Sequence, residues 1–289
     1  MSAGEVPSAA ALNLPAPHGA YEAVPRTVGQ TLILSRYQFR NYLRSQRFVL
    51  MMSIVAVISA ILILVVSHFR PAGIIGSSTA FFGTLWTGGV EVLIVFAGVI
   101  FGGDAIAGEF QNKTGYFLMG LPVRRTTVYA GKYVAAFAAS LVTILVYLAV
   151  LMAYGATFFG TGAVSVALFE SLALAVLYLS ALLGTTFLFS SLFKTSMYGV
   201  LVVAVLFLFG FTLIVDLIEG LVGIEPWFIV TYANAIIGYP FSGVPTHIGR
   251  FGGITTYAPT YVEGIAIMVG YFLLTTIGGL LLFEREEFT

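Results

Sequence analysis

Long runs of apolar residues dominate the chain, and six of them are long enough to cross a lipid bilayer. A helix rises about 1.5 Å per residue, so about 20 residues span the roughly 30 Å of hydrocarbon. The runs predict six transmembrane helices, at about residues 48–67, 82–106, 133–158, 164–193, 197–215 and 262–283. Only short linkers separate the third, fourth and fifth runs, which predicts helical hairpins.

The segment before the first run, residues 27–46, has the pattern of an amphipathic helix. Its arginines fall within one stripe about 80° wide on a helix that turns about 100° per residue, and they are Arg36, Arg40, Arg44 and, just beyond, Arg47. A basic amphipathic helix beside a span is typical of an interfacial helix among lipid headgroups, although a solvated charged face is the alternative. Residues 1–26 are rich in Ala and Pro, which predicts a disordered cytoplasmic tail.

The segment between the fifth and sixth runs, residues 216–261, mixes apolar residues with prolines and glycines. This composition predicts a re-entrant external segment whose short helices dip into the outer leaflet. Trp227, Tyr232 and Tyr239 suit an aromatic belt at the membrane surface.

The composition supports a membrane protein and excludes several other classes. Hydrophobic residues make up 59% of the 289 residues and charged residues 9%, against roughly 25% charged in a soluble domain. Thirteen Lys and Arg balance thirteen Asp and Glu, so no basic excess is present to bind nucleic acid. The chain has no cysteine, which excludes a disulfide scaffold and a thiolate metal site.

The distribution of the cations predicts the topology. With the amino terminus in the cytoplasm, eleven of the thirteen Lys and Arg lie inside and only Arg70 and Arg250 lie outside. Cytoplasmic loops carry such an excess. The six spans therefore place both termini in the cytoplasm, and the protein is expected in the plasma membrane.

Motifs for enzymatic chemistry do not occur. The chain has no G-x-x-x-x-G-K-[ST] loop, so it contains no such nucleotide-hydrolysing site of its own. His18, His68 and His247 are far apart in the sequence, and none lies in a zinc motif. We therefore expect no enzyme activity, no metal site and no cofactor in this chain.

The second run carries two features inside the predicted membrane. Glu91 lies about nine residues into it, where an ionisable group is costly unless it is paired or faces water. It is a candidate pathway residue, or else it makes a structural bond to a neighbouring helix, to Arg70 or to Arg250. Gly98 and Gly102, four residues apart, predict a close helix contact.

The loop after the second run carries a short apolar stretch between charged residues. Tyr116 to Leu121 lie between Gly115, which lets the chain bend, and Pro122, which ends a helix. An exposed apolar patch with a charged rim is typical of a partner-binding surface. The rim residues are Glu109, Arg124 and Arg125. The alternative is a loop that folds back on its own bundle.

The same loop resembles the signature region of the ABC-2 family of ABC transporter permeases. The matching residues are Asp104, Gly108-Glu109, Gly115, the apolar run, Pro122-Val123 with Arg125, and Gly131-Lys132. Thr114-Gly115 inverts the commoner Gly-Thr order. The six-span plan also fits, so the resemblance covers nearly all of residues 27–289, with residues 47–289 as the six-span domain.

The resemblance implies an all-α permease subunit, more often an exporter, that pairs with a second permease copy (a homodimer or a paralogue). It makes the loop a cytoplasmic coupling helix that docks on a separate ABC ATPase subunit, where ATP and magnesium are expected. The implied coupling residues are Glu109, Gly115, Tyr116, Phe117, Leu118, Pro122, Arg124 and Arg125. The alternatives are a secondary transporter or channel using Glu91 and Asp104, and a membrane anchor that recruits an ATPase without transport.

Overall fold

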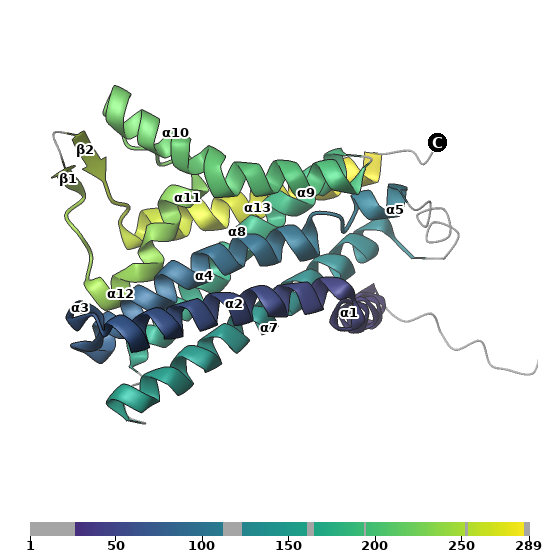
Figure 1. Ribbon diagram of the computed structural model, residues 1–289. Helices are drawn as coiled ribbons and strands as arrows, with labels where there is room; N and C mark the ends of the chain where they lie inside the picture. Colours follow the sequence, from purple (N-terminus) through teal and green to yellow (C-terminus); the bar gives the residue numbers. More distant parts are fainter. Residues whose placement is uncertain (1–26, 112–122, 161–164, 194, 252–253, 286–289) are drawn as a thin grey trace, which may run out of the picture.

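The computed structural model describes residues 27–111, 123–160, 165–193, 195–251 and 254–285. Within these ranges, six helices are long and apolar enough to cross a membrane, which confirms the predicted all-α, six-span architecture. They form a bundle with roughly aligned axes (Figure 1). Their bounds are α2 Gln46–Phe69, α4 Ser78–Gly102, α7 Arg125–Phe159, α8 Val166–Leu192, a fifth span Ser196–Val222, and α13 Tyr261–Arg285.

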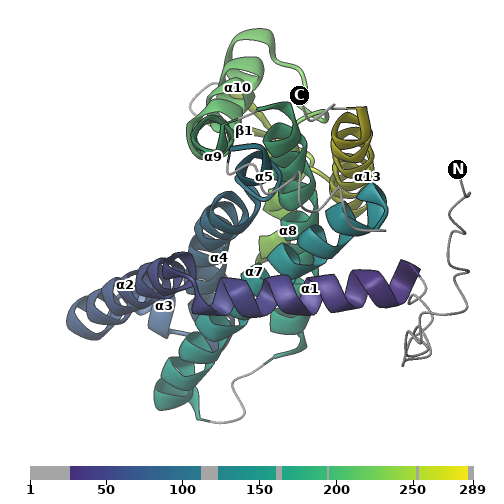
Figure 2. The same cartoon turned by 90° about the vertical axis from the view of Figure 1, so that its right-hand side faces the viewer.

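The first helix, α1 (Thr27–Arg44), lies across one end of the bundle (Figure 2). We call this end, where α5 (Ala107–Gln111) and the last turn of α13 also lie, the α1 end (Figure 1). The predicted helix was too long, because α1 ends at Arg44 and Ser45 starts α2 by accepting a hydrogen bond from the Phe48 amide. Arg47 therefore belongs to α2, and the predicted stripe of four arginines is divided between two helices.

Two close contacts attach α1 to the bundle. The Tyr42 hydroxyl, which is buried, donates to the Phe101 carbonyl of α4 at 2.9 Å. On α7, a Cβ at Gly131 would lie 2.9 Å from the Leu34 side chain, so this glycine allows α1 to pack directly on the α7 backbone. The crossing helix is thus fixed to α4 and α7.

The fifth span is longer than its apolar run predicts. It consists of α9 (Ser196–Val205), η3 (Leu206–Gly210), α10 (Phe211–Leu217) and η4 (Ile218–Val222), of which η3 and η4 are π-helical. Asp216 and Glu219 lie on its last turns and not in a following loop. The helix therefore continues for about two turns beyond residue 216, where the external segment was predicted to begin.

Small residues bring α4, α8 and α13 close together. A Cβ at Gly98 of α4 would lie 2.0 Å from a Leu182 methyl group of α8, and one at Gly102 would meet Thr186. This confirms the predicted contact of the Gly98 and Gly102 face. On the other side of α8, a Cβ at Gly184 would lie 2.5 Å from the Thr275 hydroxyl of α13.

The segment after the fifth span returns into the bundle at the end opposite α1. Its short helices are α11 (Val230–Ala233), η5 (Asn234–Gly238) and α12 (Tyr239–Ser242), and α3 (Ala72–Ile75) lies at the same end (Figure 1). Ile236 and Ile237 are fully buried. The Ser171 hydroxyl of α8 donates to the Ile237 carbonyl at 2.5 Å and accepts from the Trp86 indole of α4 at 2.9 Å, which binds the segment to two spans.

A β-hairpin, which the sequence analysis did not predict, completes this end. Strands β1 (Ile248–Phe251) and β2 (Ile254–Tyr257) pair antiparallel, with Ile248 opposite Tyr257. We call this the hairpin end. Of the three aromatic residues predicted to form a surface belt, only Trp227 is exposed. Tyr232 and Tyr239 are buried; the Tyr232 hydroxyl donates a hydrogen bond to Glu225, and the Tyr239 hydroxyl donates one to the Pro259 carbonyl. For these two tyrosines the prediction was wrong.

Candidate functional site

The predicted coupling loop begins and ends at the α1 end of the bundle, where α5 stops at Gln111 and α7 starts at Arg125. Five of its predicted residues lie outside the described ranges: Gly115, Tyr116, Phe117, Leu118 and Pro122. Glu109, Arg124 and Arg125 are described. The site can therefore be built from the two ends of the loop.

Glu109, at the start of the loop, forms an ion pair with Lys132 of α7. The Lys132 side chain is only 5% exposed, and its ammonium also donates to the Ala105 carbonyl at 2.8 Å. Burial of an ammonium is tolerated only with such partners. Glu109 therefore joins the two ends of the loop, in addition to any role in binding a partner.

Asp104, at the end of α4, forms a second ion pair with Arg47 in the first turn of α2, at 2.5 Å. The Asp104 side chain is 13% exposed and that of Arg47 is 48% exposed. This pair is partly solvated, so its free energy is expected to be small. It fixes the direction in which the chain leaves α4.

Neutral hydrogen bonds attach the same segment to α8 and to the fifth span. The hydroxyl of Ser190, a fully buried residue of α8, accepts from the amides of Ile106 and Ala107, both at 3.0 Å. The Gln111 side chain accepts from the Ser196 amide at the start of α9, also at 3.0 Å. The base of the loop is thus bonded to α2, α7, α8 and α9.

The far side of the loop presents basic residues. Arg124 is exposed at the N-cap of α7, and Arg125 donates to the Glu284 carbonyl near the end of α13 at 2.8 Å. The predicted interfacial arginines of α1, Arg36, Arg40 and Arg44, are exposed at the same end. Cations of the loop and of α1 therefore gather at one end of the bundle, as the predicted topology requires.

Glu91 lines a cavity of about 320 Å³ between α4, α8, the fifth span and the re-entrant helices. The other polar residues of its wall include Tyr178, Thr212, Thr231 and Asn234. Among the described side chains, none forms an ion pair with Glu91. An acid at this depth must be paired or reach water, and a cavity with several polar residues in its wall is where water would have to enter.

Residues 32–288 match the sequence profile of a family described as ABC-2 family transporter protein. The chain belongs to the ABC-2 transporter family. The match covers all six spans and the loop between α4 and α7, and it identifies this multi-pass membrane protein as a permease component of an ABC transporter. A comparison with curated proteins found no match.

The geometry gives the ABC-2 loop residues roles that the motif alone did not. The sequence placed Asp104, Glu109 and Lys132 in one pattern; in the fold, Asp104 pairs with Arg47 of α2, and Glu109 pairs with Lys132 of α7. Ser190 was missed, because a serine within an apolar helix has no distinguishing pattern. Its burial and its two backbone donors reveal the role.

Proposed function

We propose that this chain is the membrane-spanning subunit of an ATP-driven exporter, coupled through the loop between α5 and α7 to a separate ATPase subunit. The observation that carries the proposal is the bonding of the loop's base to four spans. A displacement of the loop by a closing ATPase would move these spans together, because a packed bundle shifts as discrete elements.

A second permease copy is the expected partner within the membrane. In their apolar windows, α2 is only 22% buried and the fifth span and α13 are each 11% buried, against 72% for α4. Lipid or a second copy covers these faces. The cavity of Glu91 is lined by residues of the fifth span, so a copy seated there would lie beside the candidate pathway.

The coupling proposal is tested by charge reversal at the loop. Arg124→Glu changes an exposed residue at the α1 end, and Arg70→Glu is the matched control, since Arg70 is an exposed arginine at the hairpin end. We expect at least a tenfold weaker affinity for the ATPase with the first variant, about 1.4 kcal/mol, and no change with the second. The measurement is ATP hydrolysis by the complex purified through the permease.

Two results would contradict the proposal. One is ATP-independent flux of solute through the purified chain alone, which would instead indicate a secondary transporter or channel. The other is equal loss of ATPase binding in both arginine variants. Glu91→Gln separates the pathway from the docking, because it should lower transport while the ATPase stays bound.

A further inference from the structure

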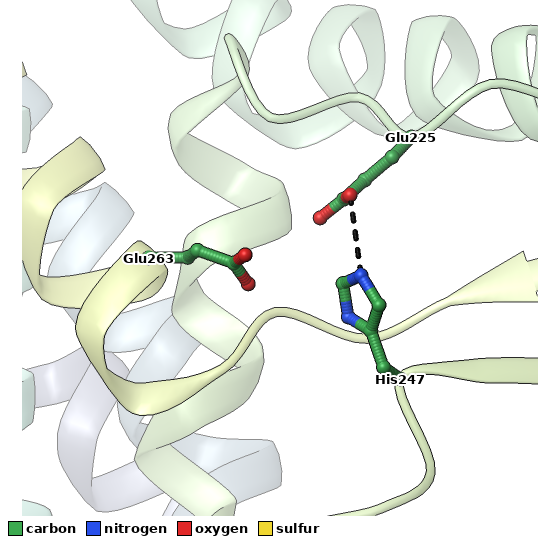
Figure 3. Close-up of side chains that lie close together, drawn as sticks. All are labelled: Glu225, His247 and Glu263. Atoms are coloured by element: carbon green, nitrogen blue, oxygen red, sulfur yellow. Dashed lines mark ion pairs between the residues drawn. The ribbon is translucent and has the colours of Figure 1, made fainter.

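Three chain segments meet at the hairpin end and bring together a histidine and two glutamates. Glu225 follows the fifth span, His247 precedes β1, and Glu263 lies in the first turn of α13. One donor atom from each lies within 4.8 Å of the others. Figure 3 shows the three side chains pointing toward a common space. From the sequence we expected no metal site, because the three histidines are far apart along the chain and none lies in a zinc motif.

The distance between two of the donor atoms matches metal ligation better than direct bonding. His247 Nε2 and Glu225 Oε2 are 3.4 Å apart, which is long for a charge-assisted hydrogen bond, normally about 2.7–2.9 Å. Two ligands about 2.0–2.2 Å from one tetrahedral zinc ion lie about 3.3–3.6 Å from each other. The pair is therefore spaced as two ligands of one ion, and Glu263 would need only a small movement to become the third.

Each of the three side chains is also held by a neighbour through one of its polar atoms. The Ala258 carbonyl lies 2.8 Å from His247 Nδ1, the Tyr232 hydroxyl donates to Glu225 Oε1 at 2.7 Å, and the Thr260 amide donates to Glu263 Oε2 at 2.7 Å. Metal-binding histidines nearly always donate their second ring N–H to a carbonyl or carboxylate, and ligating carboxylates are hydrogen-bonded in turn. Nε2, Oε2 of Glu225 and Oε1 of Glu263 remain as ligand atoms.

We propose that Glu225, His247 and Glu263 form a binding site for one divalent transition-metal ion, with zinc as the best match. One imidazole and two carboxylates form a three-ligand set whose two negative charges balance the two positive charges of a zinc ion, with the fourth position left to water. The bound ion joins the end of the fifth span, the hairpin and the start of the sixth span. It holds the two spans together at the hairpin end, and this role does not depend on the proposed coupling to an ATPase.

The test is zinc binding by the purified, chelator-stripped full chain, measured by competition with a zinc indicator. The hydrogen bond to the Ala258 carbonyl raises the pKa of His247, so protons compete with the metal, and the titration is run at about pH 8, above the ordinary histidine pKa of about 6.5. We expect one zinc ion per chain and a higher midpoint of thermal unfolding. His247→Ala should abolish both effects.

His68→Ala is the matched control, because His68 is an exposed histidine at the same end of the bundle. It should bind zinc as the unchanged chain does. Tyr232→Phe removes only the hydroxyl that positions Glu225 and should weaken binding about 10–100-fold. Equal binding by the unchanged chain and His247→Ala would overturn the proposal, and so would loss of binding in His68→Ala.

A spectroscopic measurement on the unchanged chain keeps the proposal testable if His247→Ala does not fold. X-ray absorption of the zinc-loaded protein should show one imidazole and oxygen ligands at about 2.0–2.2 Å. A spectrum without the imidazole, or with a six-coordinate shell of oxygens, would overturn the site.

Discussion

The ion pair between Glu109 and Lys132 gives the sharpest prediction. Lys132→Met removes a cation whose side chain is only 5% exposed and breaks its ion pair with the Glu109 carboxylate, which is 20% exposed. The Ala105 carbonyl also loses its donor from Lys132. Removal of one partner from a buried ion pair costs about 3–5 kcal/mol. We expect a loss of unfolding free energy near the lower end of that range, since Glu109 retains some contact with solvent.

The double variant Glu109→Gln/Lys132→Met isolates the interaction itself. It leaves no uncompensated charge, so it should be destabilised by less than the sum of the two single variants, with a coupling energy of about 1.5–3 kcal/mol for a charge-assisted bond. The assay is equilibrium unfolding of the purified chain in mixed micelles, followed by circular dichroism. Additivity of the single variants within about 0.5 kcal/mol would refute the reasoning.

Asp104→Asn is the control for this experiment, because it leaves behind the exposed partner of the second ion pair. Arg47 pairs with another acid of the same motif, Asp104, but its side chain is 48% exposed. Solvent screens such a pair, so the variant should cost at most about 1 kcal/mol. A cost equal to that of Lys132→Met would mean that burial does not set the strength of these contacts.

Three further variants test contacts elsewhere, by the same unfolding assay. Ser190→Ala leaves two buried amides without their acceptor and should cost about 2–4 kcal/mol; a cost under about 0.5 kcal/mol would argue against this role. Gly98→Ala puts a methyl group 2.0 Å from Leu182 and should cost about 1–3 kcal/mol, while Gly88→Ala on the same helix meets nothing within 4 Å and should be tolerated. Tyr42→Phe removes the bond between α1 and α4 and should cost about 0.5–1.5 kcal/mol, with faster tryptic cleavage in α1; unchanged cleavage would contradict this.

The spans could be predicted from sequence because the hydrocarbon thickness fixes how many apolar residues a helix needs. The end of the fifth span could not. Asp216 and Glu219 look like the start of an external loop, yet the helix continues through them to Val222. Backbone hydrogen bonding extends a helix beyond its apolar run wherever polar side chains can reach water.

The hairpin was missed although its pattern is present in the sequence. Two short segments, residues 248–251 and 254–257, flank a Gly-Gly pair, and the second contains adjacent β-branched residues. Such an arrangement favours a two-residue turn between strands. These strands were not predicted, because the apolar runs on either side indicated a helical membrane protein.

The candidate site could be predicted only as a set of positions. The motif placed Asp104, Glu109 and Lys132 near one loop, but it could not say that Glu109 reaches Lys132 or that Asp104 reaches Arg47. Partner choice depends on how α2 and α7 pack beside α4. In the same way, His247 is 22 residues from Glu225 and 16 from Glu263 in the printed sequence, and only the fold makes them neighbours.

The crossing helix α1 has a consequence for how the bundle can move. If its arginines lie among anionic headgroups, as their pattern predicts, each contributes about 1 kcal/mol to holding the helix at that depth. Because α1 is fastened to α4 through Tyr42 and to α7 at Gly131, a piston-like motion of either span along the membrane normal would pull it out of the headgroup layer. Tilting of these spans about an axis in the membrane plane leaves α1 at its depth. In that position, α1 opposes movement of these spans along the membrane normal, so a rocking motion of the bundle costs less free energy.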